Sequence, residues 1–184
     1  LDAPDDCPTD SLHGPQRLVV SVRIKPPLWA EGRQAMPPPI TADNNSVRCR
    51  VGDRVRHFAY DNVFTGGQAL VFARVGRPMV EAAYQGYNVC LFAYGATGSG
   101  KSYSMYGGGT RETRGLIPRM CAKVFHTAQE RLAAAPHLAL AVSLQYVEVY
   151  NEQVRDLLQP DYEKGDRLKN LDLYKGRGRV TSIR

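Results

Sequence analysis

The chain has 184 residues, 43% of them hydrophobic and 23% charged, a balance typical of one globular domain or of part of a larger one. No apolar run approaches the roughly 18 residues that a membrane-spanning helix needs. Residues 1–14 lack the basic and apolar regions of a secretory signal, and the net charge of +6 permits an acidic partner without identifying one.

The cysteines and histidines form no spacing typical of a metal site or a disulfide framework. No two cysteines make a C-x-x-C pair, so we expect reduced thiols in an intracellular, cytoplasmic protein. Each histidine is interpreted as a surface or hydrogen-bonded side chain. These residues are Cys7, Cys49, Cys90, Cys121, His13, His57, His126 and His137.

The first part of the chain predicts a leader, a strand and a hairpin. Residues 1–16 are polar and contain proline, so we expect a disordered leader. Residues 18–24 are β-branched and predict a strand, which Pro26 stops. Residues 46–60 alternate weakly around Gly52, which predicts a β-hairpin.

The middle of the chain predicts a helix, a buried strand and a second, short helix. Residues 68–84 carry apolar side chains at helical spacing, and we expect Gly76 and Pro78 to break or kink this helix. Residues 89–94 are a short apolar run typical of a buried strand. Residues 101–106 predict one or two helical turns.

The remaining segments complete an alternation of helices and strands. Apolar residues over 117–132 recur at the spacing of one helix face. Residues 138–149 predict a long strand covered on both faces, followed by a short apolar piece over 154–158. This order predicts an α/β fold whose central sheet is mixed but mainly parallel, with helices on both faces.

Residues 95–102 read G-A-T-G-S-G-K-S, a complete phosphate-binding loop of the form G-x-x-x-x-G-K-[S/T]. Its glycines allow a tight turn whose backbone N–H groups point at an anion. Lys101 can reach the terminal phosphates, and the Ser102 hydroxyl can ligate Mg²⁺. The loop follows a predicted strand and precedes a predicted helix, as phosphate binding requires. The alternative is a glycine-rich turn between two core elements.

The residues around this loop narrow the choice among P-loop NTPases, because the chain resembles the N-terminal half of a kinesin motor domain. The resemblance covers most of residues 18–158. Its motifs, in kinesin order, are V-S-V-R-I-K-P at 20–26, F-A-Y-D-N-V-F at 58–64, G-Y-N-V-C-L-F-A-Y-G-A-T-G-S-G-K-S-Y-S-M at 86–105, G-L-I-P-R at 115–119 and Y-V-E-V-Y-N-E-Q-V-R-D-L-L at 146–158.

The resemblance implies a complete ATP/ADP and Mg²⁺ site. Tyr103 would stack on the adenine, whereas ordinary packing is the alternative for this ring. Arg23 and Lys25 would line the other side, whereas a solvated strand end is the alternative for the pair. The implied contacts are Arg23, Lys25, Pro26, Gly95, Ala96, Thr97, Gly98, Ser99, Gly100, Lys101, Ser102 and Tyr103, with Lys101 and Ser102 as the catalytic pair and Ser102 as the Mg²⁺ ligand.

Two departures from the kinesin pattern are mild. Lys25 stands where kinesins usually carry arginine, which is a better stacking partner than lysine. Ser102 replaces the commoner threonine and keeps the hydroxyl.

The region after Leu158 resembles a kinesin loop and hairpin that touch tubulin. A basic hairpin would bind the acidic tubulin surface in a salt-dependent way, and a merely solvated basic loop is the alternative. The basic residues are Lys164, Arg167, Lys169, Lys175, Arg177 and Arg179.

Two later kinesin segments, N-x-x-S-S-R-S-H and D-L-A-G-S-E, do not occur in the sequence. We therefore expect residues 17–184 to be the N-terminal part of a motor domain, truncated before the switch segments and with an incomplete sheet. Any dimerisation would use regions absent here.

The resemblance implies an ATP-dependent motor that moves along microtubules of the cytoplasmic cytoskeleton, with the kinesin-type ATPase in the complete head. The first alternative is a non-catalytic remnant that binds nucleotide or microtubules. The second is an unrelated P-loop NTPase such as a nucleic-acid translocase, although no nucleic-acid or membrane partner is expected.

Overall fold

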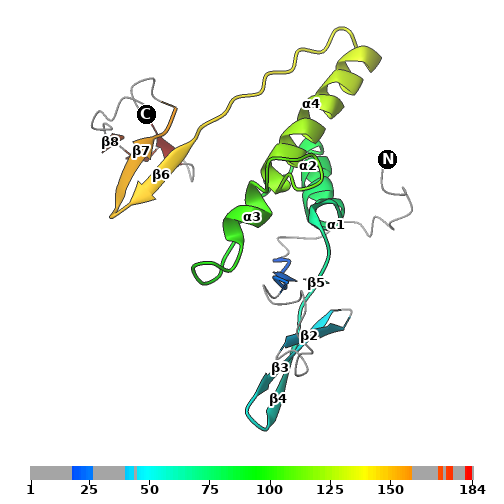
Figure 1. Ribbon diagram of the computed structural model, residues 1–184. Coiled ribbons are helices and arrows are strands. Elements are labelled where there is room, and N and C mark those ends of the chain that lie inside the picture. The colour runs from blue at the N-terminus through cyan, green and yellow to red at the C-terminus, as the bar shows by residue number, and fades with distance from the viewer. Residues whose placement is uncertain are drawn as a thin grey trace. The chain divides into compact units, whose positions relative to one another are not determined.

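The computed structural model describes residues 18–26, 40–43 and 45–158, and the backbone of residues 170–171, 173–175 and 181–183 (Figure 1). By its contacts the chain divides into two compact units, Leu1–Pro136 and His137–Arg184, which are treated one at a time below. The predicted leader over residues 1–16 lies outside the described residues.

The first unit contains the parallel strand pair of the α/β fold. Strand β1 (Ser21–Arg23) pairs in parallel with β5 (Asn62–Phe64), with Arg23 opposite Phe64. The Ile24 amide extends the pairing by donating to the Phe64 carbonyl at 2.8 Å. The predicted strand over 18–24 is therefore confirmed at its centre.

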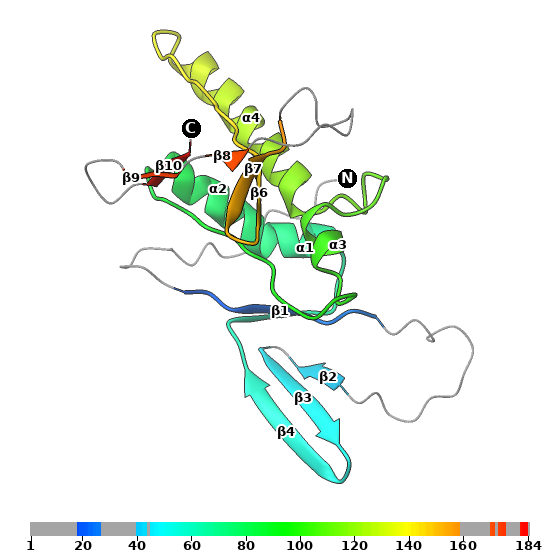
Figure 2. The ribbon, with the colours of Figure 1, turned by 90° about the vertical axis from the view of Figure 1, so that its left-hand side faces the viewer.

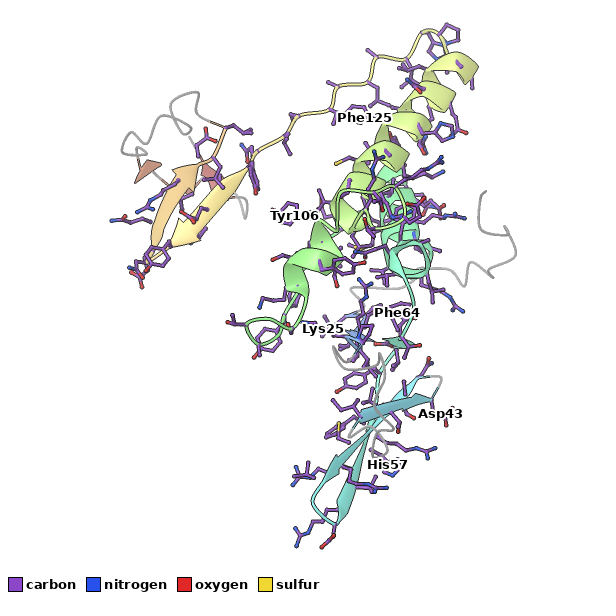
Figure 3. All side chains as sticks on the ribbon, in the orientation of Figure 1. Lys25, Asp43, His57, Phe64, Tyr106 and Phe125 are labelled. Carbon is purple, nitrogen blue, oxygen red and sulfur yellow. The ribbon has the colours of Figure 1, made fainter. Side chains whose placement is uncertain are left out.

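Three antiparallel strands form a separate small sheet in this unit (Figure 2). They are β2 (Ile40–Asp43), β3 (Ser46–Val51) and β4 (Arg54–Ala59). Gly52 in the β3–β4 turn has φ +60°, a left-handed conformation that glycine adopts without strain. The predicted hairpin around Gly52 is thus confirmed. Figure 3 labels Asp43 and His57 on this sheet.

A helical run interrupted by a π-helical turn follows β5. Helix α1 (Gln68–Val71) continues into the π segment η1 (Phe72–Gly76) and then into α2 (Arg77–Tyr84). Pro78 has no N–H to donate to the Arg74 carbonyl, so the regular α-helical bonding cannot continue through this point. The π-helical turn η1, which is wider than an α-helical turn, lies directly before α2. It is the irregularity that the sequence predicts at Gly76 and Pro78.

Two further helices complete the first unit. Helix α3 (Lys101–Met105) follows the phosphate-loop sequence, and α4 (Leu116–Ala134) follows after residues 107–115. Helices α2 and α4 pack side by side, with the Tyr84 hydroxyl donating to the Val124 carbonyl at 2.6 Å (Figures 1 and 2). No helix in the described part of the chain is both long and apolar enough to span a membrane.

The hydrophobic core of the first unit lies where β5, the helical run and the start of α4 meet. Phe64, Val71 and Leu116 are its buried centre, each about 95% excluded from solvent. The partly buried side chains around them are Phe72, Val75, Leu91, Met105 and Met120. Met105 is therefore the residue by which the short helix α3 packs against this core.

The second unit consists of short antiparallel strands. Strands β6 (Val147–Tyr150), β7 (Gln153–Asp156) and β8 (Asn170–Leu171) form one sheet. Strands β9 (Leu173–Lys175) and β10 (Thr181–Ile183) form another. The basic side chains predicted to touch tubulin, from Lys164 to Arg179, lie outside the described residues.

Two predicted strands are wrong in whole or in part. Residues 89–94 were expected to be a buried strand, but they pair with no described strand, and Phe92 and Tyr94 are 72% and 96% exposed. Only the last part of 138–149 is a strand, within β6, and Leu144 is 74% exposed. An interior strand needs neighbours at both edges, and no described segment supplies them.

The α/β class and the incompleteness of its sheet are confirmed. The described strands form two pairs and two three-stranded sheets instead of one central sheet. Of these, β1 with β5 is the parallel pair, and the other described pairs are antiparallel.

We predict that residues 1–184 expressed alone are poorly soluble or molten, because apolar side chains such as Phe92 and Leu144 are exposed. Thermal unfolding and hydrophobic-dye binding measure this, with the native polypeptide that carries this sequence as the control. A soluble monomer with a cooperative unfolding transition would contradict the prediction.

Candidate nucleotide-binding site

The backbone of the loop over residues 95–102 has the conformation that its glycines allow. Gly95, Gly98 and Gly100 have φ values of +151°, +78° and +98°. Side chains other than hydrogen are strained in these conformations. A Cβ on Gly95 would also come within 2.7 Å of the Ser99 hydroxyl oxygen. The tight turn therefore depends on glycine at these positions.

Lys101 lies over its own loop. Its Nζ donates to the carbonyls of Gly95 at 2.9 Å and Ala96 at 3.0 Å. An ammonium group has three N–H donors, so this arrangement leaves one for another acceptor. The side chain thus adds positive charge at the mouth of the loop.

The start of α3 adds N–H donors next to this ammonium. Gly100 is the N-cap residue, and no side chain caps the helix there. The first N–H groups of a helix have no acceptor within the helix and carry partial positive charge. The glycine loop, the Lys101 ammonium and the free N–H groups at the start of α3 together form a positively polarised site that fits a phosphate group.

Ser102 is the second residue of α3 and is exposed. Among the described residues, no group of three His, Cys, Asp or Glu side chains is placed to hold a metal ion. The Ser102 hydroxyl, together with phosphate and water oxygens, could supply the ligands of a Mg²⁺ ion at this loop. That hard-oxygen set fits the ion's preference.

Lys25 and Pro26 follow β1 beside the loop. Lys25 Nζ donates to the Gly98 carbonyl at 2.9 Å, which ties the segment after β1 to the turn. Pro26 is exposed and belongs to no helix or strand. Figure 3 labels Lys25 and Phe64, where the paired strands β1 and β5 end. Contact of either residue with adenine stays a prediction.

The structure brings Arg23 and Tyr103 together. The guanidinium carbon of Arg23 lies 5.2 Å from the centre of the Tyr103 ring, within the range of a cation–π interaction. Arg23 Nη1 also donates to Gln68 Oε1 at 2.8 Å and to Ser104 Oγ at 3.1 Å. Tyr103 remains 46% exposed, so its ring is accessible although Arg23 lies over it.

Sequence reasoning missed Gln68, a buried polar residue that is 2% exposed. Its Nε2 donates to the Tyr103 carbonyl at 2.6 Å and the Thr113 carbonyl at 3.3 Å. The signal was present, because Gln68 precedes Val71 and Val75 by three and seven residues and so shares their apolar helix face. A glutamine on such a face needs hydrogen-bond partners.

Residues 107–115 between α3 and α4 are folded tightly. Arg119 donates to the carbonyls of Arg111, Glu112 and Arg114 at 2.8–3.1 Å. Gly107 has φ +85°, and a Cβ there would collide with the Thr113 carbonyl. Because Gln68 also holds this carbonyl, the segment is part of the same network.

The comparisons with known proteins all indicate one family. A family model of the kinesin motor domain matches residues 23–182. Human kinesin-like protein KIF13B is 37% identical over an alignment of 174 residues, and the match covers 84% of this chain and 9% of that protein. Mouse kinesin-like protein KIF13A is 48% identical over 103 residues, which is 55% of this chain and 5% of that protein.

Solved structures give the same result. A KIF14 dimer in a two-heads-bound state, with AMP-PNP and in complex with a microtubule, is similar with a TM-score of 0.74 and 29% identity. That match covers 91% of this chain and 48% of the KIF14 chain. An ADP form of KIF14 in complex with a microtubule gives a TM-score of 0.72 and 30% identity.

This chain therefore spans about half of those solved chains and a small part of the curated relatives. Its fold is that of the P-loop NTPases, with the phosphate-binding sequence at residues 95–102. Together with the family match over residues 23–182, these similarities show that the chain belongs to the kinesin motor domain family.

Proposed function

We propose that this chain supplies the nucleotide-binding part of an ATP-dependent microtubule motor. In the complete head it would bind Mg-ATP and couple hydrolysis to movement along microtubules of the cytoplasmic cytoskeleton. The carrying observation is the loop over residues 95–102 of a kinesin-family chain, where left-handed glycines precede α3, a helix that begins at Lys101 and has no side-chain cap.

The loop residues have distinct roles in this proposal. Lys101 holds the β- and γ-phosphates with a charge-assisted hydrogen bond, a contact worth about 1.5–3 kcal/mol. The N–H groups at the start of α3 add further donors. Ser102 offers its hydroxyl to Mg²⁺, which, when bound, neutralises charge on the phosphates.

The adenine is assigned to the Tyr103 ring. A purine gains about 1–3 kcal/mol from stacking on an aromatic side chain. Arg23 adds a cation whose guanidinium carbon lies over the Tyr103 ring, 5.2 Å from the ring centre. Lys25 and Pro26 would approach the base from the segment after β1, where Lys25 already binds the loop backbone.

Hydrolysis needs more than phosphate binding. Groups must orient the attacking water and stabilise charge on the γ-phosphate. In kinesins these come from the N-x-x-S-S-R-S-H and D-L-A-G-S-E segments, which the 184 residues do not contain. The second candidate function is a nucleotide- or microtubule-binding module without turnover.

Microtubules are the proposed partner. The KIF14 structures similar to this chain are complexes with a microtubule. The family match extends to residue 182, so it includes the basic residues that resemble a tubulin-contacting hairpin. The functional test is therefore made with microtubules and ATP.

We predict that Lys101→Ala abolishes ATP-stimulated release of the native polypeptide from microtubules. Loss of the ammonium should weaken nucleotide binding about ten- to hundredfold, the equivalent of one charge-assisted hydrogen bond. Cosedimentation with and without ATP measures release, and Lys123→Ala on α4 is the matched control. Normal release by the Lys101 variant would refute the assignment.

The same assays separate the candidate functions. Microtubule-stimulated phosphate release by the unmodified polypeptide supports the motor. Binding of ATP without turnover supports the non-catalytic module. Intact mass and peptide mapping of the native polypeptide establish whether it contains the two switch segments.

We predict that Gly100→Ala destabilises the protein by about 1–2 kcal/mol, the cost of a left-handed alanine, and weakens nucleotide binding. Gly109→Ala is the control, because neither glycine has an atom within 4 Å of an added Cβ and only Gly100 has positive φ. The control should stay within about 1 kcal/mol of the unmodified protein. Equal losses of unfolding free energy in denaturant would contradict the loop geometry.

A further inference from the structure

We propose that Gln68 is the positioning residue of the nucleotide-base site, because its buried amide holds both Arg23 and the backbone of Tyr103, the two partners of the cation–π contact. The inference rests on the proposed nucleotide-binding function. It deepens that function by assigning part of base recognition to a residue that does not touch the base.

The orientation of the Gln68 amide is determined by its partners. Oε1 accepts from Arg23 Nη1 at 2.8 Å, and Nε2 donates to the carbonyls of Tyr103 and Thr113. With the amide reversed, donors would face the guanidinium and an acceptor would face two carbonyls. At 2% exposure, water offers no substitute partner, so one orientation is strongly preferred.

The first consequence concerns Arg23. Its guanidinium is held by Gln68, by Ser104 Oγ at 3.1 Å and more weakly by the Gly66 carbonyl at 3.5 Å. These contacts come from the protein, so the guanidinium is placed over the Tyr103 ring before any ligand arrives. A base then stacks on the accessible part of a ring whose cation partner is already fixed.

The second consequence concerns helix α3. This helix has five residues and no fully buried side chain. A single helical turn is unstable without tertiary contacts. Gln68 supplies one, because it begins α1, whose Val71 is buried in the core, and it holds the Tyr103 carbonyl at 2.6 Å.

The effect should be specific to the base. No described contact joins Gln68 to the phosphate-binding loop, whereas Lys101 bonds only to loop carbonyls among the described contacts. Loss of the amide therefore weakens the part of binding that depends on the adenine. Binding of a polyphosphate without a base depends on the loop and should change little.

The test compares two ligands in the native polypeptide. Gln68→Met keeps the side chain's length and removes its hydrogen bonds, and Gln129→Met at an exposed position of α4 is the matched control. We expect the Kd for Mg-ATP to rise about tenfold, comparable to losing much of a base stack. The Kd for magnesium tripolyphosphate should stay within about twofold, and the control should change neither.

A double-mutant cycle with Tyr103→Ala distinguishes positioning from a general structural role. If Gln68 acts through Tyr103, the loss of ATP affinity in the double variant should be close to that of Tyr103→Ala alone. Additive losses, or equal losses for ATP and tripolyphosphate, would overturn the inference.

A second variant keeps the test decisive if Gln68→Met does not fold. Arg23→Lys removes the planar fork that reaches Gln68, Ser104 and Gly66 together. It should weaken ATP binding severalfold and leave tripolyphosphate binding unchanged; unchanged ATP binding would overturn the inference. An unmodified protein that binds neither ligand would instead reject the proposed function, and with it the inference.

Discussion

The buried amide of Gln68 is the constraint on which the proposed nucleotide-base site depends. A polar group removed from water must be fully hydrogen-bonded or it costs about 1–3 kcal/mol. The amide meets this condition by binding Arg23 at the end of strand β1, Tyr103 on α3 and Thr113 in the loop before α4. The same bonds that satisfy the glutamine therefore join elements far apart in the sequence and place the ring proposed to stack on adenine.

A different kind of constraint shapes the phosphate loop. There the conformation depends on the backbone itself, because Gly95, Gly98 and Gly100 adopt positive φ values that other residues adopt only with strain. The loop is linked to the rest of the unit by Lys25 and by the start of α3. The proposed site thus combines a loop for phosphate, set by local backbone conformation, with a ring for the base, set by long-range hydrogen bonds.

Sequence patterns correctly predicted the elements that depend on residues close in the sequence. They failed for elements that depend on contacts with distant segments. The hairpin at Gly52, the irregular helix over 68–84 and the loop at 95–102 follow from glycine, proline and apolar spacing close in the sequence. Residues 89–94 look like a strand, but a strand exists only with neighbours, which the described residues do not provide. The place of Gln68 on an apolar helix face is visible in the sequence, but its partners are not, because they lie 35 and 45 residues away.

A high-resolution structure of the native polypeptide bound to Mg-ATP tests the central claim most directly. The account predicts that Arg23 still donates to Gln68 Oε1, that Tyr103 keeps its backbone bond to Gln68, and that the adenine stacks on the accessible face of the Tyr103 ring. A structure in which Arg23 has left Gln68 to contact the base, or in which the adenine lies away from Tyr103, would contradict it.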